Sequence, residues 1–136
     1  LLHIVSAQEQ IFSGDVTMVS VMSSHGELGI LARHTPLMTL LRPGEARLKL
    51  PNNENEYIYL SGGMMEVQPR EVTVLADTAL RGDQIDEQAA LQAKRRAEES
   101  IRTSVLYSDR DRAQAEMIKA LAQLRTLEDT RRKRRA

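Results

Sequence analysis

The residues with the most reactive side chains are scattered along this 136-residue chain. The three histidines, His3, His25 and His34, lie in separate segments, and none has the close spacing of a helical pair of metal ligands. Isolated histidines of this kind are typical of surfaces and interfaces. The chain has no cysteine, which excludes disulfides, thiolate chemistry and cysteine-ligated zinc. We therefore expect neither a metal centre nor a cofactor.

Neighbouring acidic residues and a glycine doublet are the other candidates for catalysis. Glu98 with Glu99, and Asp109 with Asp111, lie on helix-like stretches, where solvated faces and helix caps are commoner than acid and base pairs. The glycines at 62–63 lack the lysine and the strand-to-helix context of a phosphate loop, so they indicate a strand break. The sequence predicts a protein that is not an enzyme.

The charge is balanced overall but unevenly placed. The chain has nineteen basic and nineteen acidic residues, so its net charge gives no general attraction to nucleic acid or membrane. Acidic residues outnumber basic ones before Asp83, whereas the end of the chain is the basic run Arg131, Arg132, Lys133, Arg134 and Arg135. No aromatic residue is interleaved with this run for base stacking. A nucleic-acid patch and a tail for an acidic protein surface both remain open, and the second is at least as well supported.

Glycine and proline divide the chain into two parts. All seven glycines and all four prolines lie between Gly14 and Gly82. Turn-rich β structure uses both residue types, and helix interiors exclude them. We therefore expect a β domain over 1–82 and a helical domain over 83–136.

The first part is a series of short apolar segments separated by turn residues. The segments expected to be strands are 2–5, 15–22, 37–41, 45–50, 56–61, 64–68 and 72–76. A change of alternation within 15–22 predicts a bulge, and 23–29 is predicted to be a loop. So many short strands in about 80 residues indicate an antiparallel β-sandwich or flattened barrel. The short connections argue against parallel pairing.

The second part has helical periodicity. Asp83 or Asp86 can cap a first helix, and the pair Ser108 and Asp111 resembles a capping box for a second. Each helix carries an apolar stripe. The stripe residues are Ala90, Ala93, Ala97 and Ile101 in the first helix, and Ala113, Met117, Ala120, Leu121, Leu124 and Leu127 in the second. We expect an antiparallel two-helix hairpin with a hinge at 103–108, and its alanine-rich seam buries too little apolar area to hold it firmly.

The sequence shows neither a membrane-spanning segment nor a recognisable signal peptide. No apolar run approaches the ~18 residues needed to cross a bilayer, and the start lacks the pattern of a signal peptide. The chain begins at Leu1, without methionine and within a strand-like segment, so we expect that further residues precede it.

Several segments, taken in order, resemble the epsilon subunit of the bacterial F-type ATP synthase. These segments are GELGIL at 26–31, HTPL at 34–37, YLSGG at 59–63, VQP at 67–69, VLADTA at 74–79, AKRRAE at 93–98 and AQLR at 122–125. The resemblance covers essentially the whole chain. Many motifs in one order are much more specific than any one of them.

The resemblance implies a non-catalytic subunit of the central rotor stalk. The sandwich would hold the gamma subunit and touch the c-ring, at the cytoplasmic face of the bacterial inner membrane. The hairpin would leave the sandwich, extend along gamma into the hexamer of alpha and beta subunits, and block rotation in the direction of ATP hydrolysis. The isolated subunit would be a monomer without affinity for nucleic acid. The alternative is a free-standing β-sandwich binding module with a basic helical tail for nucleic acid or acidic protein.

The resemblance also implies contact residues on the sandwich. The c-ring contact maps onto Glu27, Leu28 and Gly29, on a small projecting loop whose alternative reading is a simple β-turn. The gamma contact maps near Ser6 and His34, although His34 is also compatible with an ordinary surface position.

Some members of this family bind ATP on the folded hairpin. The pattern that the resemblance implies for this site is Ile or Leu, Asp, two variable residues, Arg and Ala, with a further basic residue one helical repeat later. Ile85, Asp86 and Ala90 match this pattern, and Arg96 fits the later basic position. Ala89 stands where the pattern has an arginine. One cation binds a triphosphate only weakly, because charge-assisted contacts supply most of the affinity for phosphate groups. We therefore predict weak ATP binding or none.

The basic end of the chain exceeds the usual family pattern. Together with Arg125, the run 131–135 would contact the acidic segment of the beta subunit or the negative cavity of the hexamer. The alternative is a frayed helix end whose charges complement the helix dipole.

Overall fold

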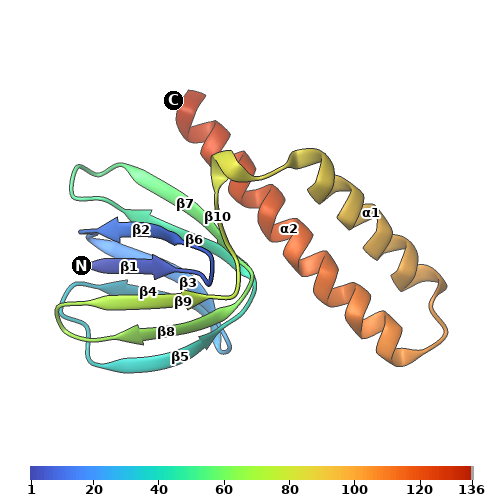
Figure 1. Ribbon diagram of the computed structural model, residues 1–136, viewed down its shortest axis with the longest axis horizontal. Helices are drawn as coiled ribbons and strands as arrows, with labels where there is room; N and C mark the ends of the chain where they lie inside the picture. Colours follow the sequence, from blue (N-terminus) through green and yellow to red (C-terminus); the bar gives the residue numbers. More distant parts are fainter. Residues whose placement is uncertain (136) are drawn as a thin grey trace.

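The computed structural model describes residues 1–135 of the chain. Within these residues, ten strands are followed by a 3-10 turn and two α-helices (Figure 1). The strands are β1 (Leu2–Val5), β2 (Gln10–Gly14), β3 (Met18–Ser23), β4 (Gly26–Leu31), β5 (Leu37–Leu41), β6 (Gly44–Lys49), β7 (Asn55–Leu60), β8 (Gly63–Val67), β9 (Val72–Ala76) and β10 (Ala79–Arg81). The turn η1 (Gly82–Gln84) leads into α1 (Glu87–Thr103) and α2 (Tyr107–Arg135).

The strands form one sheet that curls on itself around an apolar core. Their order is β10-β7-β6-β3-β5-β8-β9-β1-β2, with β4 paired to β3 outside this path. The two ends of the order meet where Arg81 Nη1 of β10 donates to Ile11 O of β2 at 2.6 Å. Alternate residues of the strands fill the core, and the most enclosed of these are Leu2, Ile4, Val19, Val21, Leu48, Ile58, Met65, Val67 and Val74. The expected β-sandwich or flattened barrel is therefore confirmed.

Three strand predictions were wrong. The segment 23–29 is not a loop, because β4 starts at Gly26 and pairs with β3 from Ser23↔Gly26 to Met18↔Leu31. The hairpin needs only the two-residue turn of Ser24 and His25, and Gly26, the first residue of β4, adopts a positive φ of 112° directly after it. The regular pairing of β3 with β4 also replaces the expected bulge. The short strands β2 and β10 were missed because neither has the apolar alternation of the others.

One pair of strands is parallel, contrary to the expectation from short connections. β1 and β9 run side by side in the same direction, from Leu2↔Val72 to Val5↔Leu75. The strands that lie between them in the sequence return the chain to the edge of β1, so no crossover helix is needed. β1 thus joins the first and last parts of the sandwich.

The helices form the expected antiparallel hairpin, with differences in detail. Asp86 is the N-cap of α1 and accepts a hydrogen bond from Ala89 N at 3.1 Å. Ser108 lies inside α2 and caps nothing, because the linking turn is shorter than expected and the helix already begins at Tyr107. Leu121 is 46% exposed and does not widen the seam. Thr126, which was not among the predicted stripe residues, is fully buried, and its hydroxyl donates a hydrogen bond to Ala122 O at 2.8 Å.

The hairpin lies against the sandwich through α2 (Figure 1). α2 packs on β6, β7 and η1, while α1 packs mainly on the far side of α2. The seam between the helices buries alanines, among them Ala90, Ala97, Ala113 and Ala120. A second small apolar cluster joins the hairpin to the sandwich, formed by Tyr59, Ile85 and Leu127. Neither helix is long and apolar enough to pass through a bilayer, as far as residues 1–135 show.

Candidate functional site

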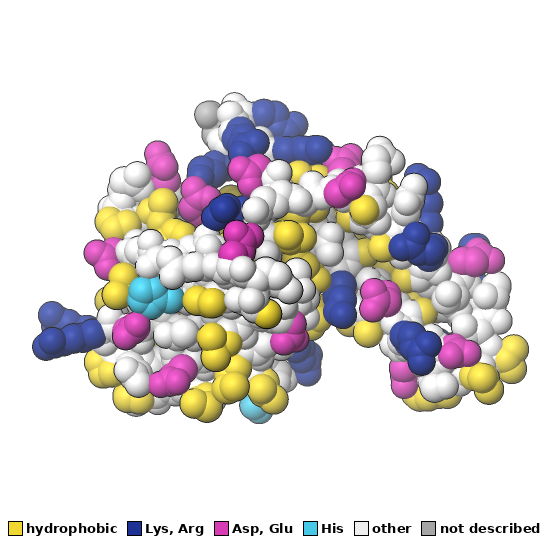
Figure 2. Space-filling model, in the orientation of Figure 1, with side chains coloured by type: hydrophobic (Ala, Val, Ile, Leu, Met, Phe, Trp, Pro, Cys, Tyr) yellow, Lys and Arg dark blue, Asp and Glu magenta, His cyan; other side chains and the backbone are white. Residues whose placement is uncertain are grey.

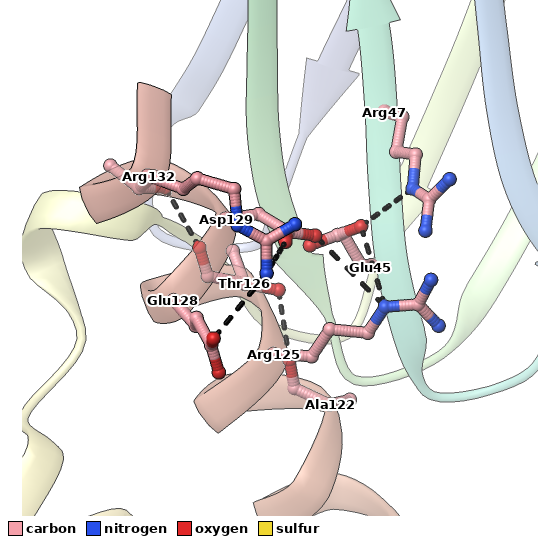
Figure 3. A network of polar contacts seen from close by, with 9 residues as sticks. Glu45, Arg47, Ala122, Arg125, Thr126, Glu128, Asp129 and Arg132 are labelled. Carbon is pink, nitrogen blue, oxygen red and sulfur yellow. Dashed lines mark hydrogen bonds and ion pairs between the residues drawn. The ribbon is translucent and has the colours of Figure 1, made fainter. Parts of the chain in front are cut away.

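The junction between α2 and the sandwich is built around a buried carboxyl group, that of Glu45 on β6. Its side chain is 4% exposed, and Glu45 Oε1 accepts a hydrogen bond from Arg47 Nε at 2.8 Å. Asp129 faces it from α2 with a side chain that is 14% exposed (Figure 3). Arg125 Nε lies 4.0 Å from Glu45 Oε1 and 4.0 Å from Asp129 Oδ2. Two carboxyl groups from different domains therefore share one small, poorly hydrated space.

The environment of Glu45 favours its neutral form. The pKa of Glu45 is raised from 4.5 to about 7, mainly by burial and then by the neighbouring Asp129 carboxyl, while Arg47 opposes both effects. Glu45 Oε2 has no hydrogen-bond partner among the described residues. The group is thus ready to gain or lose a proton near neutral pH.

The basic end of α2 is paired with acidic residues elsewhere in the same chain. Arg131 forms an ion pair with Glu87 at the start of α1. Lys133 Nζ lies 3.0 Å from Glu56 Oε1 on β7, and Arg134 Nη2 lies 3.4 Å from Asp83 Oδ2 in η1. Figure 2 shows basic and acidic side chains gathered around this end of the helix.

The basic residues from Arg131 to Arg135 all lie inside α2. The helix continues to Arg135, and Arg132 pairs along it with Glu128 at 3.3 Å and with Asp129 at 3.7 Å. Exposed pairs of this kind stabilise by about 1 kcal/mol or less each. The docked end of α2 is therefore held by several weak contacts.

The predicted c-ring residues lie on an edge strand. Glu27, Leu28 and Gly29 all belong to β4, which pairs with β3 alone among the strands of residues 1–135. Glu27 and Gly29 are exposed, whereas Leu28 is half-buried and packs against the core. The three residues therefore do not share a face, and Leu31 joins the exposed pair instead.

The two predicted gamma residues lie at opposite ends of the strands. Ser6 follows β1 in a turn closed by hydrogen bonds with Glu9, and His34 precedes β5, with its Nδ1 2.7 Å from Thr35 O. The strand register places the start of β5 at the same end of the strands as the start of β1, whereas Ser6 follows the other end of β1. The structure thus separates these two residues by the length of the sheet.

An exposed apolar row crosses the sheet surface between them. Leu40, Met64 and Leu75 are cross-strand neighbours on β5, β8 and β9, and Val5 of β1 continues the row. Leu40 is 63% exposed and Leu75 is 54% exposed, whereas Met64 and Val5 are half-buried. Sequence reasoning missed this row, although the outward phase of each strand contained the signal.

The residues of the nucleotide pattern are not brought together. Ile85 is buried against Tyr59, and the Asp86 carboxylate is used as the cap of α1. Arg96 lies ten residues beyond Asp86, or about 15 Å along the helix. It lines a hollow between the helices with Ser100, Asp109 and Arg112, among others. Across residues 1–135, the His, Asp and Glu side chains form no group of three or more that could hold a metal ion.

Comparisons with known proteins cover both parts of the chain. The family model described as the ATP synthase Delta/Epsilon chain, beta-sandwich domain, matches residues 1–82, and the long alpha-helix domain of the same chain matches 83–128. The ATP synthase epsilon chain of Nitrosococcus oceani is 52% identical over 132 residues, which are 97% of this chain and 94% of that relative. The epsilon chain of Halorhodospira halophila is also 52% identical, over 133 residues and the same shares of the two chains.

Two solved structures share the fold. One is a chain of the Euglena gracilis mitochondrial ATP synthase, in an assembly of OSCP, F1 and c-ring, with a TM-score of 0.79 and 21% identity over 95% of this chain and 79% of that one. The other belongs to the central stalk and c-ring of the Tetrahymena thermophila mitochondrial ATP synthase, with a TM-score of 0.58 and 11% identity over 93% and 94% of the two chains.

Proposed function

This chain belongs to the ATP synthase Delta/Epsilon chain family as an epsilon chain, a non-catalytic subunit, and from that premise we propose how it acts. We propose that it joins the gamma subunit to the c-ring at the foot of the central stalk. The observation that carries this proposal is the match to epsilon chains over nearly the full length, with both parts in the same order. We place the subunit peripherally, at the cytoplasmic face of a bacterial inner membrane.

The outer face of β5, β8, β9 and β1 is the proposed gamma contact. It contains the apolar row of Leu40, Met64, Leu75 and Val5, and Ser6 follows directly at its end. Exposed apolar rows are uncommon on proteins that have no partner. This row crosses four strands, so a long helix of the partner can lie across it. A broad contact of this kind also accommodates His34 at the opposite end of the strands.

The c-ring contact is proposed for the edge strand β4. Glu27 and Leu31 point outward from it, and Gly29 leaves the backbone between them accessible. An edge strand offers unpaired backbone groups as well as side chains to a partner. This surface replaces the projecting loop that the sequence suggested.

The hairpin is proposed to be the regulatory part, which inhibits ATP hydrolysis after it leaves the sandwich. Three features support this. The seam between the helices is rich in alanine, α1 has little contact with the sandwich, and the end of α2 is held by surface ion pairs. Each feature lowers the free energy needed to open the hairpin. Once released, Arg125 and the basic residues from Arg131 to Arg135 become available to the alpha and beta subunits.

Assembly with the other subunits is the test of this function. We expect the chain to co-purify with gamma and with the alpha and beta subunits when they are produced together. A chain that remains apart from gamma under these conditions contradicts the central-stalk proposal. A nucleic-acid module is less well supported, because Arg131, Lys133 and Arg134 are engaged with acidic residues of the chain itself.

A further inference from the structure

We propose that Glu45 and Asp129 form a proton-sensitive latch, which holds the hairpin on the sandwich when they share a proton and loosens when both are ionised. The inference rests on the proposed release of the hairpin and adds the condition that controls it. The latch consists of one residue from each domain, so its energy is lost when the domains separate.

The geometry of the pair calls for a shared proton. Glu45 Oε1 is satisfied by Arg47, but Oε2 has no partner among the described residues although it is buried. Asp129 stands against it from α2 (Figure 3). Two ionised carboxylates are acceptors only, so they cannot satisfy each other, whereas a single proton between them satisfies both.

The charged groups next to the pair lie on β6 and α2. Arg47 on β6 and Arg125 on α2 favour ionisation of Glu45, and Arg132 on α2 lies 3.7 Å from Asp129 Oδ1. Arg125 and Arg132 extend into solvent, which screens their charges. Arg47 is the remaining group that lowers the pKa of Glu45, and the burial of Glu45 has the larger effect.

β7 contributes a neutral group, Tyr59, directly opposite Glu45. Burial raises the pKa of Tyr59, so its hydroxyl stays neutral, and the neighbouring Gln123 of α2 only partly offsets this rise. Glu27 of β4 acts on this network only through the charge of Arg47. None of these groups donates a hydrogen bond to Glu45 Oε2, so this oxygen gains a partner only when the carboxyl pair holds a proton.

The direction of the pH effect follows from the two states of Glu45. In the docked hairpin the pKa of Glu45 is raised from 4.5 to about 7. When α2 leaves, the side chain meets water and loses Asp129, so its pKa returns toward the ordinary value. A proton therefore binds the docked form more tightly. Docking is strongest below the ordinary value, weakens as the pH rises, and is weakest above about pH 7. Linkage gives a fall of about tenfold in the docking equilibrium between about pH 6 and about pH 8.

Two measurements on the full isolated chain test the latch. The first is a carboxyl titration of Glu45 by NMR, which we expect to show a midpoint near 7 that moves toward the ordinary range in Asp129→Asn. The second follows docking by dipolar spectroscopy between spin labels on cysteines introduced at Asn52 and Arg135. Both positions are exposed near the junction, and the chain has no native cysteine to interfere. We expect the docked population to decrease from about pH 6 to about pH 8.

Two substitutions separate the latch from general pH effects. Glu45→Gln keeps a hydrogen-bond donor for Asp129 without titrating, so it should remove the pH dependence of docking. Glu128→Gln is the matched control, because Glu128 neighbours Asp129 on α2 but lies in solvent, and it should leave the pH dependence unchanged.

Three results would overturn the latch. One is a midpoint for Glu45 in the ordinary carboxyl range, and this result stands even when Glu45→Gln fails to fold. The others are a docked population that does not change with pH, and a pH dependence that persists in Glu45→Gln. None of these depends on inhibition of ATP hydrolysis, so failure of the latch can be told apart from failure of the proposed function.

Discussion

Gly82 and Thr130 lie in direct contact where η1 meets the last turns of α2, and a β-carbon at Gly82 would overlap the Thr130 side chain. The Thr130 hydroxyl is fixed by its hydrogen bond to Thr126 O at 2.8 Å. The helix can therefore approach the sandwich this closely only because residue 82 has no side chain. The last glycine of the chain thus serves the docking of the hairpin as well as the end of the β domain.

The substitution Gly82→Ala should push α2 away from the sandwich. Overpacking at a close contact costs about 1–3 kcal/mol, which is enough to shift a weakly held hairpin toward the open state. Dipolar distances between labels at Asn52 and Arg135 measure the shift. Gly14→Ala is the control, because a β-carbon there would meet only Phe12 at an ordinary distance of 3.5 Å. Unchanged docking in Gly82→Ala would contradict the role given to this contact.

The substitution Leu75→Glu should weaken binding to gamma. It places a charge in the middle of the exposed apolar row, where a bound partner would exclude water, and we expect a loss of at least about tenfold in affinity. Titration of the isolated chain with gamma measures the effect. Leu106→Glu is the matched control, since Leu106 is also exposed but lies in the turn between the helices. Equal losses for the two variants would argue against a gamma contact on this face.

Deletion of residues 83–136 should raise ATP hydrolysis by the assembled enzyme. If about half of the complexes hold an extended hairpin, removing this block should roughly double the rate. Hydrolysis is measured on purified complexes, with the subunit ratio as the control that the shortened chain still assembles. The inhibitory role fails if truncated complexes hydrolyse ATP no faster than complete ones and no other inhibitor is present.

The substitution Ala89→Arg should create or strengthen ATP binding. It restores the cation that the family pattern has at this exposed position of α1, and we expect a gain of about tenfold or more from charge-assisted contacts. Calorimetry measures the gain, with Gln88→Arg as a control that adds the same charge at the neighbouring position. A low micromolar dissociation constant for the unchanged chain would show that Arg96 and its neighbours already suffice.

The sequence by itself determined the local structure of most of the chain. The absence of glycine and proline beyond Gly82 indicated helices, because both residues disfavour helix interiors. Asp86 was one of two candidate caps, beside Asp83, and the alanines of both stripes indicated a seam, because each signal depends on residues within one or two turns. The ordered motifs indicated the family for a similar reason, since they are read directly along the chain. The glycines of β4 were misleading, because glycine is compatible with both a loop and an edge strand.

Only the tertiary structure decided how the two parts meet. The contact of Glu45 with Asp129, and the pairing of Lys133 with Glu56, join residues from different domains. The burial that raises the pKa of Glu45 depends on α2 lying over β6. The parallel pairing of β1 with β9 and the apolar row at Leu40, Met64 and Leu75 likewise required the register of distant strands. Local propensities act over a few residues, whereas these features depend on surfaces that exist only after the chain has folded.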